Sequence, residues 1–365
     1  MTDADPAGLA DLAADGPDEM GRELAAGPAA MEGALAAVER AAPLLAALRD
    51  QSRRTVLVGT GASLAVARTA APLWRRCDRG RGRDGPLLVR ESTAAVFGDA
   101  DGEEFLPTDL VIAISQSGTS PETVAAARRA SAIGAAVVAI GAAASSTLCA
   151  DARLCIVTPS GEEGGAATKS ALAALAVLLA IPGAVATDVA SRAAIADRLR
   201  NVVADWPSPA SLGPLLAGAD RLWIVGLGTA AGLTASGGLL WHEKVHRPAI
   251  ATTVSEFRHG PLEAARAADR VLLLDVDPPV TARTGYLTLL REELGRLRVP
   301  LVTVAPGAAA EQPGIHLGLA PGGPAALEAL RRLLQLARAT AHAAGTYQDG
   351  FRILRAIVHA APNLD

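Results

Sequence analysis

The sequence is poor in cysteine and in aromatic residues. Its three cysteines, Cys77, Cys149 and Cys155, are odd in number and scattered. They predict neither a disulfide framework nor a metal site, and they suit a reducing, cytoplasmic location. Aromatic residues are 3% of the 365 residues and hydrophobic residues are 50%, so the core must consist of Ala, Val and Leu. This composition predicts a layered α/β protein with one large or two medium domains.

Strong charge of one sign and a membrane-spanning segment are also missing. The net charge of −4 gives no overall attraction to nucleic acid, and we expect no nucleic-acid partner. The one basic run, residues 75–83, contains two glycines, an aspartate and no aromatic residue, so we interpret it as a solvated loop. The acidic N-terminus does not resemble a signal peptide. The longest apolar run, residues 171–186, is interrupted by Pro182-Gly183 and is shorter than the ~20 residues of a membrane span, so it predicts a buried helix and no membrane contact.

Short apolar strands alternate with helical segments along the chain. Residues 20–47 predict two helices separated at Gly27-Pro28, after a leader of about twenty residues. The expected strands are 55–58, 87–89, 110–114, 135–140 and 154–157, and the expected helices run from residue 62 to 74, from 124 to 135 and from 168 to 179. This alternation predicts a parallel, doubly wound sheet.

The same pattern restarts in the second half of the chain. VLVGTGASLAVARTAAPLW at residues 56–74 and WIVGLGTAAGLTASGGLLW at 223–241 share a VGxG turn and end in Leu-Trp at the same spacing. Such a restart indicates an internal duplication, so we predict two similar α/β subdomains. The predicted limits are a leader with N-terminal helices at 1–50, a first subdomain at 51–200, a second at 201–345 and a C-terminal tail at 346–365.

Residues 115–123, SQSGTSPET, lie between a predicted strand and a predicted helix. Ser120 suits the N-cap and Pro121 the first helical position. Free backbone N–H groups, the helix dipole and several hydroxyls would favour an anion there, although an ordinary capped turn is the alternative. The second copy carries DVDPP at the same place, residues 275–279, so the architecture itself does not require hydroxyls. We therefore predict a phosphate site in the first copy alone.

Two further stretches contain candidate functional residues. The glycine-rich segment 161–170 either closes over a ligand or only connects two elements. His242 and His246 have a spacing that can hold zinc, but no third ligand is evident, so we expect no metal. His259 precedes Gly-Pro, where a histidine is more often a structural hydrogen-bonding residue than a catalytic one.

SQSGTSPET, the paired GxG turns and SEFRHGP at residues 255–261 together resemble the sugar isomerase (SIS) domain family. The chain is similar over nearly its whole length to the isomerase half of glucosamine-6-phosphate synthase and to stand-alone sugar-phosphate deaminases and deglycases. The resemblance implies a tandem, flavodoxin-like fold, a phosphorylated sugar as substrate, no cofactor and a homodimer.

The resemblance also implies roles for individual residues. Glu243 aligns with the base that moves a proton between C1 and C2 of the sugar, and His259 with a histidine that helps to open the ring from a neighbouring subunit. The residues implied to hold the substrate phosphate are Ser63, Ser115, Gln116, Ser117 and Ser120. Those implied to lie on the loop that covers the sugar are Glu162, Ala167 and Thr168.

The sequence departs from the family at two lysines. Leu240 stands one helical turn before Glu243, and Ala356 takes the place of the tail lysine, with Arg355 beside it as the tail candidate. An arginine stays protonated and cannot form a Schiff base. Three functions therefore stay open: an aldose–ketose isomerase, a deaminase or deglycase, and a non-catalytic sugar-phosphate-binding protein. Thr2 follows Met1 where a glutamine-hydrolysing domain would need its cysteine, so we expect no such domain.

Overall fold

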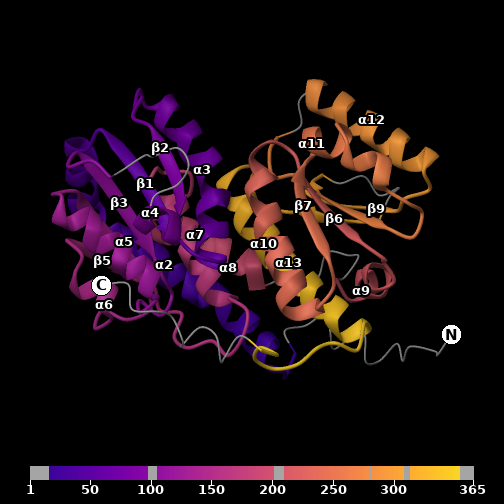
Figure 1. Ribbon diagram of the computed structural model, residues 1–365, viewed down its shortest axis with the longest axis horizontal. Coiled ribbons are helices and arrows are strands. Elements are labelled where there is room, and N and C mark those ends of the chain that lie inside the picture. The colour runs from indigo at the N-terminus through magenta and orange to yellow at the C-terminus, as the bar shows by residue number, and fades with distance from the viewer. Residues whose placement is uncertain (1–15, 98–104, 201–208, 279–280, 308–312, 354–365) are drawn as a thin grey trace. The chain divides into compact units, whose positions relative to one another are not determined.

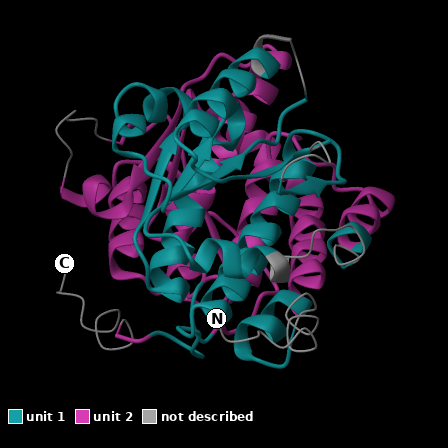
Figure 2. Cartoon of the chain, turned by 90° about the vertical axis from the view of Figure 1, so that its right-hand side faces the viewer, with its two compact units in different colours: residues 1–25, 164–166, 197–351 teal, residues 26–163, 167–196, 352–365 magenta. Residues whose placement is uncertain are grey.

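The computed structural model describes residues 16–97, 105–200, 209–278, 281–307 and 313–353 (Figure 1). The chain divides into two compact units that interleave along the sequence (Figure 2). Unit 1 comprises residues 1–25, 164–166 and 197–351, and unit 2 comprises 26–163, 167–196 and 352–365. The subdomain limits drawn from the sequence stay a prediction.

Unit 2 contains a parallel five-stranded sheet with the order β2-β1-β3-β4-β5. Its strands are β1 (Arg54–Gly59), β2 (Leu87–Glu91), β3 (Asp109–Ile114), β4 (Ala136–Gly141) and β5 (Leu154–Val157). The accompanying helices are α3 (Ala62–Gly80), α4 (Ser92–Phe97), α5 (Pro121–Ala132), α6 (Thr147–Ala150) and α7 (Lys169–Ala180). Val124 and three alanines of α5 pack on alternate residues of the strands, and α3 packs against α7. Every residue of β3 is buried, as a strand covered by helices on both faces requires.

Unit 1 repeats this arrangement with the order β10-β9-β8-β6-β7. Its strands are β6 (Leu222–Gly226), β7 (Ala249–Thr253), β8 (Arg270–Leu274), β9 (Leu301–Pro306) and β10 (Gly314–Leu317). Its helical elements are α9 (Pro209–Ala217), η2 (Gly228–Gly232), α10 (Leu233–Leu240), η3 (Trp241–Val245), α11 (Val254–Arg258), η4 (Pro261–Ala264), α12 (Thr281–Arg296) and α13 (Gly323–Ala343). Numbered within its own copy, each sheet has the order 2-1-3-4-5, which is flavodoxin-like. The predicted pair of doubly wound subdomains is confirmed.

The two helices expected at the N-terminus are one continuous helix, α2 (Glu19–Gln51), so the predicted break at Gly27-Pro28 was wrong. Pro28 has no N–H to donate to the carbonyl of Leu24, four residues earlier, which normally ends or kinks a helix. Here the guanidinium of Arg331 in α13 donates to Leu24 O at 2.5 Å. A partner distant in sequence thus satisfies the carbonyl that proline leaves free.

The loop expected at residues 75–83 begins only after Gly80, because α3 continues to that residue. Within this stretch the Trp74 Nε1 donates to Asp78 Oδ2 at 2.8 Å, one helical turn later. Asp78 also forms an ion pair with Arg49 of α2. The aspartate inside the basic run therefore anchors a helix where we had predicted a solvated loop.

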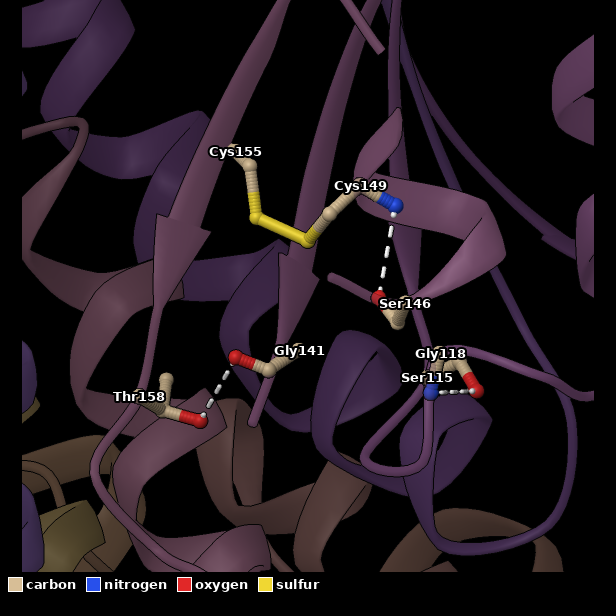
Figure 3. Close-up of a disulfide and its surroundings, with 7 residues drawn as sticks. All are labelled: Ser115, Gly118, Gly141, Ser146, Cys149, Cys155 and Thr158. Carbon is tan, nitrogen blue, oxygen red and sulfur yellow. Dashed lines mark hydrogen bonds between the residues drawn. A yellow bond between two sulfur atoms is a disulfide. The ribbon is translucent and has the colours of Figure 1, made fainter. Parts of the chain in front are cut away.

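Cys149 of α6 and Cys155 of β5 form a disulfide, which corrects the expectation of unpaired cysteines (Figure 3). The one-turn helix α6 follows β4 and precedes β5 in the sequence, and these two strands pair in parallel. This path brings the two Cα atoms to 5.1 Å. The turn of the chain that creates this proximity is not visible in the spacing of the cysteines. Cys77 is free.

The longest apolar run forms α7, and residues 170–180 are all buried there, as predicted. None of the described helices is both long and apolar enough to cross a membrane. The predicted limit between the two subdomains, between residues 200 and 201, adjoins residues 201–208, which lie outside the described residues.

Candidate functional site

The serine-rich segment follows β3 at the place where the strand order of the unit 2 sheet reverses. β1 lies beside β3, with β2 on one side of this pair and β4 and β5 on the other. Ligands of doubly wound sheets bind at the carboxyl ends of the strands at such a switch point. The turn after β1 that leads to Ser63 and the segment 115–120 after β3 both lie there. Topology therefore places the predicted phosphate residues at the expected ligand position.

Hydroxyl groups of the serine segment are hydrogen-bonded to one another. Ser115 is 2% exposed, and its Oγ lies 3.0 Å from the Oγ of Ser120. Ser117 Oγ accepts a hydrogen bond from the backbone of Thr119 at 3.2 Å. Ser120 is the N-cap of α5 and Pro121 its first residue, as predicted, but the Ser120 side chain makes no capping bond. The first N–H groups of α5 therefore have no side-chain cap, so they suit an anion.

The helix α6 packs against this segment, and its N-cap residue Ser146 lies near Gly118 (Figure 3). The backbone of Leu148 donates to Gly118 O at 3.0 Å. A Cβ atom at Gly118 would lie 2.2 Å from Ser146 Oγ, and the φ angle of Gly118 is +65°, so this position requires glycine. The disulfide at Cys149 thus belongs to the element on which the serine segment rests.

Ser63, Gln116 and Ala167 line a small cavity of about 30 Å³ in unit 2. The Gln116 amide donates to Gly161 O at 2.9 Å, which connects the serine segment to the glycine-rich loop. Three of the predicted ligand residues, taken from three separate stretches, therefore lie together.

In the glycine-rich loop, Glu163 rather than Glu162 makes the structural contacts. Glu162 is exposed. One carboxylate oxygen of Glu163 accepts from the backbone N–H groups of Thr168 at 3.0 Å and Ser170 at 2.9 Å. It also accepts from the Thr168 hydroxyl at 2.8 Å. A carboxylate at the N-terminus of α7 is favourable, and an acidic residue shortly before a helix start was the sequence signal that we missed.

The matching switch point of unit 1 is filled by the protein's own carboxylate. Asp277, in the place of Ser117, accepts from the backbone N–H of Thr229 at 2.9 Å and from its hydroxyl at 2.6 Å. Both residues are buried. In the second copy, the hydrogen-bond donors at the switch point are therefore bound to the protein's own carboxylate. In the first copy, the corresponding turn carries hydroxyls instead of a carboxylate, which agrees with the contrast seen in the sequence.

Glu243 lies in η3, a single π-helical turn that continues α10. Such turns widen a helix by one residue and occur often at functional sites. Burial raises the pKa of the Glu243 carboxyl to about 7, and the charge of Lys244 opposes this rise. His246, which follows the turn, has a φ angle of +54°. The carboxyl is thus poised to exchange a proton near neutral pH.

His259 ends α11 and is exposed. Its backbone N–H bonds to the carbonyls of Ser255 and Glu256, so the motif SEFRHGP forms a short helix and its end. Glu243 and His259 belong to unit 1, whereas the predicted phosphate and sugar-loop residues belong to unit 2. Arg355 lies outside the described residues. Among the residues that are described, no three His, Cys, Asp or Glu side chains gather as metal ligands would.

Part of the chain is similar in sequence to known proteins. Residues 104–181 match the sequence model of the SIS domain. Glutamine–fructose-6-phosphate aminotransferase (isomerizing) of Pyrobaculum aerophilum is 29% identical over 248 residues, which are 65% of this chain and 39% of that protein. The chain thus matches about two fifths of the length of this curated relative.

Two solved structures have the same fold. Tagatose-6-phosphate ketose/aldose isomerase from Escherichia coli superimposes with a TM-score of 0.78 at 21% identity, covering 89% of this chain and 93% of that one. Glucosamine-6-phosphate deaminase from Thermotoga maritima has a TM-score of 0.66 at 18% identity, covering 92% and 98%. Residues 104–181 therefore match a SIS domain, and the chain has the fold of these two solved structures.

Proposed function

We propose that the protein is a phosphosugar aldose–ketose isomerase that moves a proton between C1 and C2 of its substrate. The observation that carries the proposal is Glu243, a carboxyl group whose pKa of about 7 suits both removal and return of a proton. Burial of this carboxyl group destabilises the folded protein, and a protein that only bound sugar would gain nothing from a carboxyl that is half protonated at neutral pH.

The proposed reaction uses the two ends of the sugar differently. The phosphate is bound at the N-terminus of α5 by backbone N–H groups and by the hydroxyls of Ser115, Ser117 and Ser120. Because the phosphate does not react, its binding free energy serves to orient the other end. The Glu243 carboxylate takes the proton from the carbon next to the carbonyl, which gives a cis-enediolate. The hydroxyl proton on that carbon moves to the former carbonyl oxygen, and the Glu243 carboxylic acid returns its proton to the neighbouring carbon, where the carbonyl had been. His259 exchanges a proton with the ring oxygen as the ring opens.

A second candidate is cleavage of an amino-sugar phosphate or a sugar–amine adduct. The same carboxyl chemistry would serve it, and a protein named as a glucosamine-6-phosphate deaminase shares the fold. Since both reactions pass through proton transfer at C2, they differ in their products and not in the first step.

Incubation with a panel of hexose and hexosamine phosphates in deuterated water tests the proposal. We expect deuterium at C2 of at least one substrate, together with the isomeric product. Release of ammonia or an amine would favour the second candidate. Tight binding of a phosphosugar with no exchange in any member of the panel would show a non-catalytic binding protein and would end both proposals.

A further inference from the structure

Lys244 is buried directly beside the proposed base. The residue is 2% exposed. The 34 Lys and Arg residues of the chain include only two lysines, Lys169 and Lys244. A buried ammonium needs hydrogen-bond acceptors, so its partners show what it does.

The partners of Lys244 lie in a segment about a hundred residues later, residues 346–350, which we call the tail turn. Lys244 Nζ donates to Gly350 O at 2.9 Å and to Gln348 O at 3.3 Å. It also lies 5.7 Å from the ring centre of Tyr347. Charge-assisted hydrogen bonds of this kind are stronger than neutral ones, and the ring face adds a cation–π contact.

Further contacts join the same two parts of unit 1. The Thr346 hydroxyl donates to Val245 O, at the end of the π-turn, at 3.0 Å. The backbone N–H of Gly350 donates to a carboxylate oxygen of Glu19 in α2 at 2.5 Å. The tail turn is therefore held between the turn that carries Glu243 and the beginning of α2.

The glycine-rich loop also reaches this cluster. A Cβ atom at Gly165 would lie 2.5 Å from Lys244 Nζ and 3.1 Å from Gly350 O, so a larger residue there would force the ammonium and the tail turn to shift. Next to it, Gly164 donates its backbone N–H to Glu23 at 3.0 Å. Gly165 thus lies close to both the ammonium and the tail turn.

We propose that Lys244 is a positioning residue: its ammonium fastens the tail turn and the loop at Gly165 to the π-turn and thereby fixes the orientation of Glu243. The inference rests on the proposed function of Glu243 as the base. Lysine suits this place better than arginine, because its ammonium is compact and rotates, whereas a planar guanidinium would meet Gly165.

The charge of Lys244 has a second consequence for Glu243. It favours the carboxylate and so lowers the pKa that burial raises. The other charged or titratable groups at the cluster are Glu19 and Glu23 of α2 and Tyr347 and Asp349 of the tail turn. Glu19 and Glu23 accept from backbone N–H groups, and the Tyr347 hydroxyl donates to Asp18 at 3.0 Å and Asp349 at 3.1 Å. Arg338 and His342 of α13 lie on the far side of Tyr347, where both pair with Asp18. Loss of the Lys244 charge would therefore remove the cation that lowers the pKa of Glu243.

Two substitutions separate the geometry from the charge. Lys244→Met keeps the length and apolar stem of the side chain but removes both donors and charge, whereas Lys244→Arg keeps the charge and alters the fit. Arg296→Met, at a cation whose side chain is 77% exposed in the same unit, is the matched control. The measurements are amide hydrogen exchange of residues 346–350 in the full chain and the pH profile of C2 deuterium exchange.

We expect Lys244→Met to speed amide exchange in the tail turn at least about tenfold, as loss of two charge-assisted bonds implies. It should also lower kcat, leave KM nearly unchanged and move the acid limb of the profile to higher pH, because the pKa of Glu243 rises. Lys244→Arg should speed tail-turn exchange while the acid limb stays in place, and Arg296→Met should change neither.

Unchanged tail-turn protection in Lys244→Met would overturn the proposal. If that variant does not fold, unchanged protection and unchanged rates in Lys244→Arg would overturn it equally. If the wild-type protein introduces no deuterium at C2 of any phosphosugar, the proposed function is refuted. The amide-exchange comparison would still decide whether Lys244 fastens the tail turn.

Discussion

At the scale of single residues, Glu243 is unfavourable for folding. An ordinary glutamate ionises with a pKa near 4.5, whereas burial raises that of Glu243 to about 7. The folded state thus binds this proton more tightly than the unfolded chain does. Below about pH 4.5 Glu243 is protonated in both states and does not change the unfolding free energy. Above about pH 7 it is ionised in both states, and its burial lowers the unfolding free energy by the full amount.

Glu243→Gln should therefore stabilise the protein at high pH and little at low pH. A shift from 4.5 to about 7 corresponds to about 3 kcal/mol once both pKa values are exceeded. Urea unfolding at about pH 5 and about pH 8 measures the difference. Glu263→Gln, at an exposed glutamate, is the control and should show no such trend. An equal effect of Glu243→Gln at both pH values would contradict the elevated pKa.

The bond from Arg331 to Leu24 O makes a second prediction at this scale. Arg331→Met removes the donor to Leu24 O, a carbonyl for which Pro28 offers no N–H. The buried carbonyl is then unsatisfied, which should lower the unfolding free energy by about 1–3 kcal/mol. Pro28→Ala supplies the missing N–H from within the helix, so the same substitution should cost less in that background. A double-mutant cycle by urea unfolding should give a coupling of about 1 kcal/mol. A coupling of zero would show that Arg331 stabilises α2 by other means.

At the scale of elements, one strand–turn–helix unit is used twice with opposite contents. In unit 2 the turn after the third strand contains hydroxyls and leads to a helix without a side-chain cap. In unit 1 the carboxylate of Asp277 stands in this turn and accepts hydrogen bonds from Thr229. The sequence was sufficient to predict this contrast, because serines and aspartates at matching positions are visible in it. It also sufficed for the strands of unit 2, since each is a short apolar run that ends at Gly or at a polar residue.

Other elements depend on contacts that local patterns do not contain. The continuous α2 needs Arg331, about three hundred residues away, and the helical end of α3 needs Arg49. The π-turn at Glu243 differs from an α-helix by a single inserted residue, which periodicity over so few residues cannot detect. The disulfide depends on the path of α6 and not on the spacing of the cysteines.

The disulfide makes a prediction for α6. Cys149 and Cys155 are six residues apart, and closing so short a loop contributes about 2 kcal/mol. Reduction should lower the unfolding free energy by that amount, add about 2 Da to the mass and weaken phosphate binding, because α6 bonds to Gly118. Thermal unfolding and inorganic phosphate titration, each with and without reductant, measure this. The Cys149→Ser, Cys155→Ser double variant should not respond to reductant. A wild type whose mass does not change on reduction would contradict the bond.

At the scale of the whole molecule, the resemblance to SIS proteins leads us to expect a homodimer in which His259 acts in the partner's site. Light scattering should then give twice the chain mass of 37.0 kDa. Glu243→Gln and His259→Asn should each be inactive alone. If the residues of one site come from two subunits, mixing and refolding the variants should restore about a quarter of the wild-type activity, from the intact site in each mixed dimer. No recovery in a verified mixed dimer would place both residues in one subunit.

We propose that the chain holds a phosphate at the serine segment and moves a proton with Glu243. Deuterium exchange at C2 of a bound hexose phosphate, compared between wild type and Glu243→Gln, tests both parts together. We expect exchange in the wild type, a loss of at least about a thousandfold in the variant, and phosphosugar binding within about twofold in both. Exchange that persists in Glu243→Gln would contradict the assignment of the base.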